Sequence, residues 1–212
     1  MDLQNISSSV FPGWEQLEKQ GFIVIDDFLN PDVLRGLKAK LKSFQEQGRF
    51  KKSKIGDRFD QTLNTAIRND EIAWLSKEDE SNESLSPFFD QIKELQISYR
   101  DFFRVSIRDY EFHFAHYAKG SFYAKHLDQF NARSNRMLSI ILYLNENWQD
   151  EDGGHLRVYA GENYKDISPI GGRLVMLLSH AVEHEVMMAH RSRYSLTGWL
   201  LRHPSGVGFL DS

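Results

Sequence analysis

Two histidines and one aspartate have the residue types and the spacing to hold a metal ion. His126 and Asp128 lie two positions apart in the stretch 123–128, which has the pattern of a β-strand. Alternate side chains of a strand lie on one face, so this pair can bind one cation together. His184, near the end of a later strand-rich block, is the best candidate for a third ligand. Two imidazoles and one carboxylate on one face of an octahedral metal ion leave the coordination positions of the other face open. This arrangement is typical of non-haem Fe(II) oxygenases.

A strand with a polar face follows His184. In the run 193–199, alternate positions share one face, which carries a guanidinium, two hydroxyls and an indole: Arg193, Ser195, Thr197 and Trp199. An arginine offers a rigid fork of N–H donors that matches the two oxygens of a carboxylate. We therefore expect this face to bind a small dicarboxylate.

Other histidines compete for the role of ligand. The chain has eight histidines. His113 is expected on the same inward face of its strand as Tyr117, so it could lie near the metal or hydrogen-bond a bound molecule. His116 falls on the opposite face. The remaining ones lie at or near turns and are expected to be exposed: His155, His180, His190 and His203.

Zinc is the main alternative metal. A hydrolytic zinc site also uses three protein ligands and a water, and it needs a general base. Glu183 and Glu185 flank His184, and a strand would point both away from the site. Arg193 would have no evident task in a zinc hydrolase.

Together these motifs resemble a known family. His126-x-Asp128, His184 and Arg193, with the segments 136–148 and 153–158 between them, are similar to the 2-oxoglutarate- and Fe(II)-dependent prolyl hydroxylases. The likeness is greatest to the bacterial relatives of the hypoxia-inducible-factor hydroxylases, and it covers roughly residues 15–203.

The resemblance implies an activity and its cofactors. The expected reaction is hydroxylation of a prolyl residue in an intracellular protein at ring C4, with release of succinate and CO2. The cofactors would be Fe(II), 2-oxoglutarate as co-substrate and O2, with ascorbate as a reductant. The substrate would be a proline-bearing protein or peptide, such as a component of translation.

The resemblance also assigns residues to roles. His126, Asp128 and His184 would bind the metal, and with Arg193 they form the expected catalytic set. Arg193 and Tyr143 would hold the co-substrate, and the other residues expected around it are Tyr117, Leu156, Thr197 and Trp199. Those expected to contact the substrate are Arg68, Asp70, Tyr123 and Arg136.

Composition and charge set limits on the function. The chain has 212 residues, of which 41% are hydrophobic and 26% charged, and these values fit one globular domain. Its net charge of −4 gives no reason to expect binding to nucleic acid or to an anionic membrane. The chain contains no cysteine, which excludes disulfides, thiolate metal sites and a cysteine nucleophile. With no signal-like segment at its N-terminus, we expect a cytoplasmic protein.

The expected fold is mainly β with supporting helices. Helices are expected over 11–20, from Pro31 to before Gly48 with Asn30 as N-cap, and from Pro87 with Ser86 as N-cap. Segment 22–28 is expected to be a buried strand, and residues 77–84 a polar linker. Many short strands with glycine-bearing turns then favour a double-stranded β-helix, or jelly roll: 112–117, 123–128, 137–144, 156–159, 173–178, 184–188 and 194–202. We thus expect a single dioxygenase domain over 1–212, with helical support, first strand and substrate loop in 1–109 and the jelly-roll core in 110–203.

The basic segment 49–66 has two interpretations. It has little apolar periodicity and carries several lysines and arginines, which is typical of a solvated surface loop. In the family that this chain resembles, a loop in this region closes over the substrate, which would make the segment a mobile lid.

Two further functions stay open. The same iron site could hydroxylate a free amino acid or another small molecule. Alternatively, the chain could be a non-catalytic jelly-roll module that binds or senses a ligand.

Overall fold

The computed structural model describes residues 11–53, 64–129 and 135–203. Its helices are α1 (Trp14–Gln20), α2 (Pro31–Glu46), α3 (Lys77–Glu80) and α4 (Ser86–Phe103), with a short 3-10 turn at Asp150–Asp152. Its strands are β1 (Phe22–Ile25), β2 (Lys51–Lys52), β3 (Glu71–Trp74), β4 (Asp109–Tyr117), β5 (Tyr123–His126), β6 (Arg136–Tyr143), β7 (Leu156–Ala160), β8 (Asn163–Ile167), β9 (Leu174–Leu178), β10 (His184–Val186) and β11 (Arg193–Leu201).

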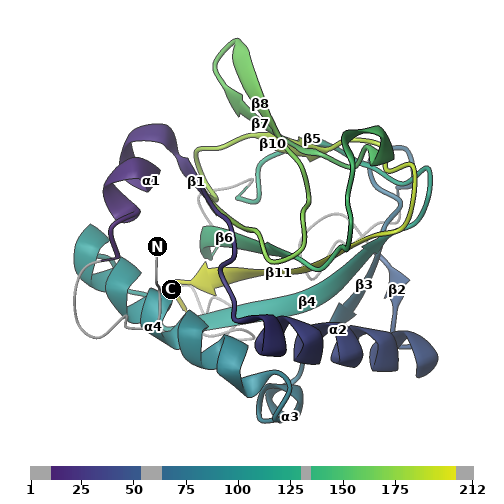
Figure 1. Cartoon of the computed structure of the whole chain (residues 1–212). Helices are drawn as coiled ribbons and strands as arrows, with labels where there is room; N and C mark the ends of the chain where they lie inside the picture. The colour runs from purple at the N-terminus through teal and green to yellow at the C-terminus, as the bar shows by residue number, and fades with distance from the viewer. Residues whose placement is uncertain (1–10, 54–63, 130–134, 204–212) are drawn as a thin grey trace, which may run out of the picture.

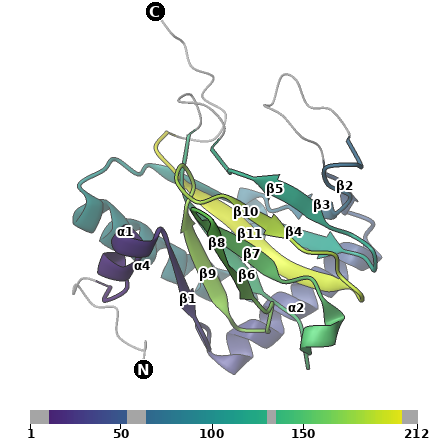
Figure 2. The same cartoon turned by 90° about the horizontal axis from the view of Figure 1, so that it is seen from above.

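Two antiparallel sheets form the body of the molecule. The larger has the strand order β1-β9-β6-β11-β4-β3-β2, and the smaller has the order β5-β10-β7-β8. Seen from above, the smaller sheet crosses over the larger one (Figure 2). This arrangement confirms the predicted double-stranded β-helix with supporting helices.

The larger sheet separates two cores. Residues at alternate positions of β4, such as Phe112 and Phe114, pack against α4 and α2, which run along one side of this sheet (Figure 1). Their neighbours Ala115 and Tyr117 join a second core with residues of the smaller sheet, such as Leu156. One face of the larger sheet therefore anchors the helices, and the other faces the smaller sheet.

The helices begin close to where the sequence places them. Asn30 caps α2, because its side chain accepts a hydrogen bond from the backbone N–H of Asp32. The prediction of Ser86 as an N-cap is wrong: Ser86 is the first residue of α4, and Leu85 precedes it without a side-chain cap.

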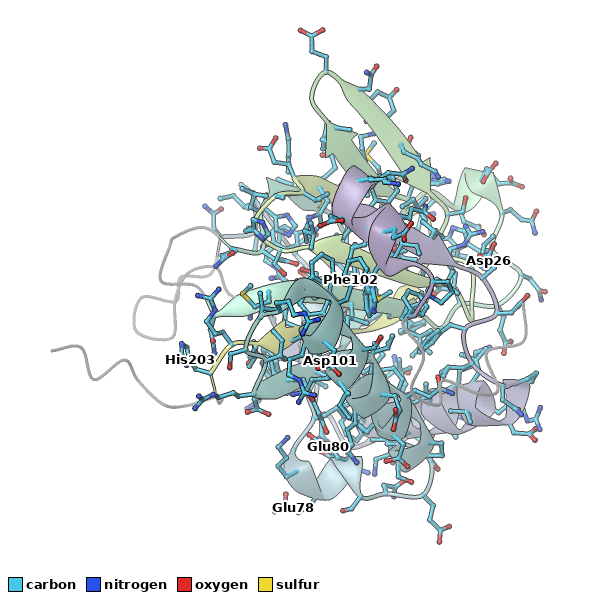
Figure 3. All side chains as sticks on the ribbon, turned by 90° about the vertical axis from the view of Figure 1, so that its left-hand side faces the viewer. Asp26, Glu78, Glu80, Asp101, Phe102 and His203 are labelled. Atoms are coloured by element: carbon cyan, nitrogen blue, oxygen red, sulfur yellow. The ribbon has the colours of Figure 1, made fainter. Side chains whose placement is uncertain are left out.

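The segment predicted as a linker contains a helix. Residues 77–80 form α3, whose Ser76 and Asp79 make a reciprocal capping box. Figure 3 shows Glu78 and Glu80 on this helix, away from the hairpin of β7 and β8. Glu80 accepts a hydrogen bond from the Tyr110 hydroxyl at 2.9 Å and so ties α3 to β4.

Several strand predictions need correction. Strand β5 ends at His126, so Asp128 lies just beyond it, and β1 ends at Ile25. Strands β2, β3 and β8 were not predicted. Strands β2 and β8 are mostly polar, and β3 has only four residues, so none shows an alternating apolar pattern. Within the described ranges, no helix is long and apolar enough to span a membrane.

Phe114 offers a test of the core between sheet and helices. Its side chain is fully buried and lies edge-on to Phe44 of α2, with ring centroids 5.4 Å apart. We expect Phe114→Ala to lower the free energy of unfolding by about 3–5 kcal/mol in urea denaturation, because it leaves a cavity. The control Ile97→Ala, on α4 with 45% of its side chain exposed, should change it by less than about 0.5 kcal/mol. Equal effects of the two variants would contradict this view of the core.

Candidate active site

The three predicted metal ligands meet in space. One ligand atom from each of His126, Asp128 and His184 lies within 4.8 Å of the others. His126 comes from β5, Asp128 from the turn after it and His184 from β10, which pairs with β5 so that the two histidines stand opposite each other. Nε2 of His126 is 3.5 Å from Asp128 Oδ1, and Nε2 of His184 is 3.8 Å from Asp128 Oδ2.

Backbone carbonyls orient both imidazoles. Nδ1 of His126 lies 2.8 Å from the carbonyl of Ala124, and Nδ1 of His184 lies 3.1 Å from that of Val182. A carbonyl only accepts, so each Nδ1 carries the proton and each Nε2 presents a lone pair. Burial lowers the pKa of His184 to about 4, so its ring is neutral and able to bind a metal at neutral pH.

The larger sheet holds the carboxylate of Asp128. Its Oδ2 accepts a hydrogen bond from the Ser139 hydroxyl at 2.6 Å and another from the Trp199 indole N–H at 2.9 Å. Burial opposes ionisation, but His184 and His126 hold the pKa of this carboxyl well below its usual range. Oδ1 is left to face His126, where a metal ion would bind.

Arg193 lies at the other end of the same face of the sheet. It is 1% exposed, although an arginine is almost never fully buried without an anionic partner. Its Nε donates to the carbonyl of Gly154 at 2.8 Å, and among the described residues no carboxylate forms an ion pair with the guanidinium. Gly154 has a positive φ of 60°, and a Cβ there would lie 3.0 Å from the Cδ of Arg193, so a glycine allows this close approach.

Two tyrosines flank the guanidinium. The Cζ of Arg193 is 5.0 Å from the ring centre of Tyr143 and 4.9 Å from that of Tyr117. The Tyr143 hydroxyl is buried and makes no hydrogen bond of good geometry. Burial raises its pKa, against the opposing effect of the nearby Arg193, so the hydroxyl stays protonated and can donate. A buried donor without an acceptor beside an unpaired guanidinium fits a carboxylate. The donor set thus fits Fe(II) at one end and a dicarboxylate such as 2-oxoglutarate at the other.

The remaining residues predicted around the co-substrate occupy this face or the sheet opposite. The Thr197 hydroxyl lies 3.0 Å from that of Ser195, and Leu156 is fully buried between the sheets. Trp199 has a more specific contact than predicted, because its indole binds the metal carboxylate.

The residues predicted to contact the substrate lie in two separate groups. Tyr123 stacks on His126 with ring centres 3.6 Å apart, and the Cζ of Arg68 lies 4.2 Å from the centre of the Tyr123 ring. Asp70 accepts two hydrogen bonds from Arg68, at 2.7 and 2.6 Å.

Arg136 belongs to the second group, with Glu111 and Trp199. It donates to Glu111 and stacks on Trp199 at 3.4 Å from the ring centre. The segment 54–63, which makes up most of the predicted lid, lies outside the described residues.

The structure disfavours the zinc alternative. Glu183 pairs with Lys125 at 2.7 Å, and Glu185 accepts a hydrogen bond from Tyr159 at 2.5 Å. Neither glutamate can serve as the general base that hydrolysis would need. A cavity of about 280 Å³ lies elsewhere, between α2 and the ends of β6 and β11, and none of the metal ligands lines it.

The sequence predictions missed three residues that support the site. Ser139 and Ser179 form a hydrogen-bonded pair at 2.9 Å behind Asp128, and Gly154 holds Arg193. Alternation along the strand puts Ser139 on the same face as Tyr143, but it does not indicate the hydrogen bond of Ser139 to Asp128. No local signal marks Ser179 or the contact of Gly154.

Comparison with known proteins gives the same picture. A family model described as "2OG-Fe(II) oxygenase superfamily" matches residues 112–201. Egl nine homolog 1 of Mus musculus is 26% identical over 192 residues, which cover 86% of this chain and 47% of the mouse protein. The chain thus spans about half the length of this relative.

Solved structures are similar over more of their length. A prolyl-4-hydroxylase of Pseudomonas putida has a TM-score of 0.81 and 34% identity, over 89% of this chain and 96% of that one. A prolyl hydroxylase of Trichoplax adhaerens, solved with a peptide fragment of the hypoxia-inducible-factor oxygen degradation domain, has a TM-score of 0.73 and 26% identity, over 89% and 86%. The chain therefore belongs to the prolyl hydroxylase family of the 2OG-Fe(II) oxygenase superfamily.

Proposed function

We propose that this protein is a 2-oxoglutarate- and Fe(II)-dependent dioxygenase that hydroxylates a prolyl residue of another protein at ring C4. One observation carries the proposal: three ligand atoms converge within 4.8 Å on the sheet face whose other end holds a buried, unpaired arginine. The prolyl hydroxylases among its relatives support the choice of substrate. Its location in the cytoplasm and a component of translation as its substrate stay predictions.

Some residues of the site would bind the metal and the co-substrate, and others orient the residues that bind. His126, Asp128 and His184 would hold Fe(II), which supplies with 2-oxoglutarate and O2 the oxidising power for hydroxylation. Arg193 and Tyr143 would bind the far carboxylate of 2-oxoglutarate. Because Trp199 and Ser139 fix Asp128 from the larger sheet, the ligand set is held before substrate arrives, which favours reaction at a single C–H bond.

Loss of a metal ligand tests the reaction. Replacing His126, Asp128 or His184 with alanine should reduce Fe(II)-dependent formation of succinate from 2-oxoglutarate to background, because the ion loses one of three protein ligands. The control is His180→Ala, which removes an exposed histidine close to His184 in the sequence and should keep wild-type turnover. Turnover in all three ligand variants would contradict the assignment.

Arg193→Ala tests how the co-substrate is held. The affinity for 2-oxoglutarate, measured by isothermal titration with Mn(II) in place of iron, should fall about 10- to 150-fold, the equivalent of about 1.5–3 kcal/mol for hydrogen bonds to a charged group. Arg202→Ala, which removes an exposed arginine just past β11, should leave the affinity unchanged.

Tyr143→Phe tests the same site and should have a smaller effect than Arg193→Ala. It removes a hydroxyl that has no partner within the protein, so the free energy of unfolding of the ligand-free protein should not fall. The affinity for 2-oxoglutarate should fall about 3- to 10-fold. An unchanged affinity in both Arg193→Ala and Tyr143→Phe would place the co-substrate elsewhere.

The substrate itself can be identified by mass spectrometry. Host proteomes with the wild-type enzyme and with the His184→Ala variant should differ by one added oxygen atom on a specific proline. Stimulation of succinate formation by free amino acids, with no modified proline, would instead favour a small-molecule hydroxylase.

A further inference from the structure

His113 is a buried polar side chain to which the proposed function gives no role. It lies within β4 and is 4% exposed, and its Nδ1 has no hydrogen-bond partner. Buried polar groups nearly always have a partner, because losing water without compensation costs free energy. The missing partner therefore points to a bound molecule.

The surroundings of His113 place it between the metal site and the surface. In the larger sheet it stands opposite Thr197 on one side and Trp74 on the other. Its ring centre is 5.4 Å from that of Trp199, whose indole binds Asp128, and 4.8 Å from that of Trp74. Trp74 is 45% exposed. A molecule that reaches His113 from solvent past Trp74 thus arrives beside the metal carboxylate.

His113 is remote from the anchor for 2-oxoglutarate. Arg193 stands opposite Tyr117, four residues further along β4, which corresponds to roughly 13 Å at the spacing of an extended strand. His113 is also absent from the cluster of ligand atoms, which belong to His126, Asp128 and His184. Its partner is therefore neither the far carboxylate of the co-substrate nor the metal.

The charges around His113 favour a neutral partner. Arg68 is paired with Asp70 and Arg136 with Glu111, so both nearby guanidiniums already have counter-ions. Burial, together with these two arginines and against the opposing effect of Asp128, lowers the pKa of His113 to about 3. The ring is then neutral and offers one N–H donor and one acceptor. An amide group matches such a ring, and the main chain of a peptide supplies its N–H and C=O at every residue except proline, which keeps only the C=O.

We propose that His113 is a specificity-determining residue that hydrogen-bonds a main-chain amide group of the substrate, at or next to the reacting proline. The proposal rests on the proposed function, since it takes the substrate to be a peptide. It predicts that the enzyme selects for the peptide backbone beside the metal as well as for the proline ring.

Nuclear magnetic resonance of the histidine ring nitrogens tests the contact directly. The protein, labelled with 15N-histidine and loaded with diamagnetic Zn(II), is titrated first with 2-oxoglutarate and then with the blocked tripeptide acetyl-Ala-Pro-Ala-amide. The ring nitrogens of His113 should not shift with 2-oxoglutarate and should shift saturably with the tripeptide. A shift with 2-oxoglutarate alone, or a tripeptide that moves the Trp199 indole signal but not His113, would overturn the proposal.

This titration also distinguishes an error in the prolyl assignment from an error in the role proposed for His113. If 2-oxoglutarate binds and the tripeptide moves no signal of the site, both the prolyl assignment and the role of His113 are wrong. If the tripeptide binds without affecting His113, the prolyl assignment stands and only the role proposed for His113 is wrong.

Variants at position 113 supply an independent measure. His113→Leu should weaken tripeptide binding about 3- to 10-fold, the value of one hydrogen bond, and leave the affinity for 2-oxoglutarate unchanged. His113→Asn or His113→Gln, which places an amide near one of the two ring nitrogens, should restore most of the loss. The control is His116→Leu, on the opposite face of β4, which should bind the tripeptide as the wild type does. Wild-type tripeptide affinity in His113→Leu, or no rescue by either amide, would reduce His113 to a packing role.

Discussion

A buried carboxylate joins the two sheets of this protein. Asp128 follows a strand of the smaller sheet, yet its Oδ2 is held by Ser139 and Trp199 of the larger one. Such a group needs partners on every side, since an unpaired buried charge is strongly unfavourable. The two imidazoles lie against this carboxylate, and a bound metal ion would be the remaining partner. The same contacts of Asp128 therefore fix how the two sheets lie against each other and how the three ligand residues are arranged.

The second constraint is the buried guanidinium of Arg193. Among the described residues it has no carboxylate partner, and the adjacent hydroxyl of Tyr143 lacks an acceptor. A bound anion would complete the hydrogen bonds of these two groups. With a cation site at the other end of the same face, the protein is complementary to a molecule that carries a carboxylate at one end and metal-binding oxygens at the other. This complementarity explains why 2-oxoglutarate would be selected over a monocarboxylate.

Alternation along strands accounts for most of what the sequence could predict. Arg193, Thr197 and Trp199 share a face as expected, and Tyr143 lies beside Arg193. Alternation alone does not identify the reaction that takes place on this face. The resemblance to a family indicated that reaction. Asp128 shows the limit of the method, because it reaches the metal site from a turn and not from the strand assumed for it.

Other features could not be predicted because they depend on contacts between distant segments. Strand β8 is polar and exposed on most of its length, so it lacks the pattern that marks a half-buried strand. The hydrogen bond from Trp199 to Asp128 joins residues 71 positions apart and requires both the register of β11 and one rotamer of the indole. The missing partner of His113 is visible only once the whole surrounding of its ring is known.

The convergence of three ligands and one anchor is the central claim, and anomalous diffraction from crystals grown with Mn(II) and 2-oxoglutarate tests it most directly. We expect one manganese ion bound by Nε2 of His126, Oδ1 of Asp128 and Nε2 of His184, with 2-oxoglutarate extending from that ion to the guanidinium of Arg193. Manganese bound by other residues, or 2-oxoglutarate with neither carboxylate on Arg193, would contradict the account.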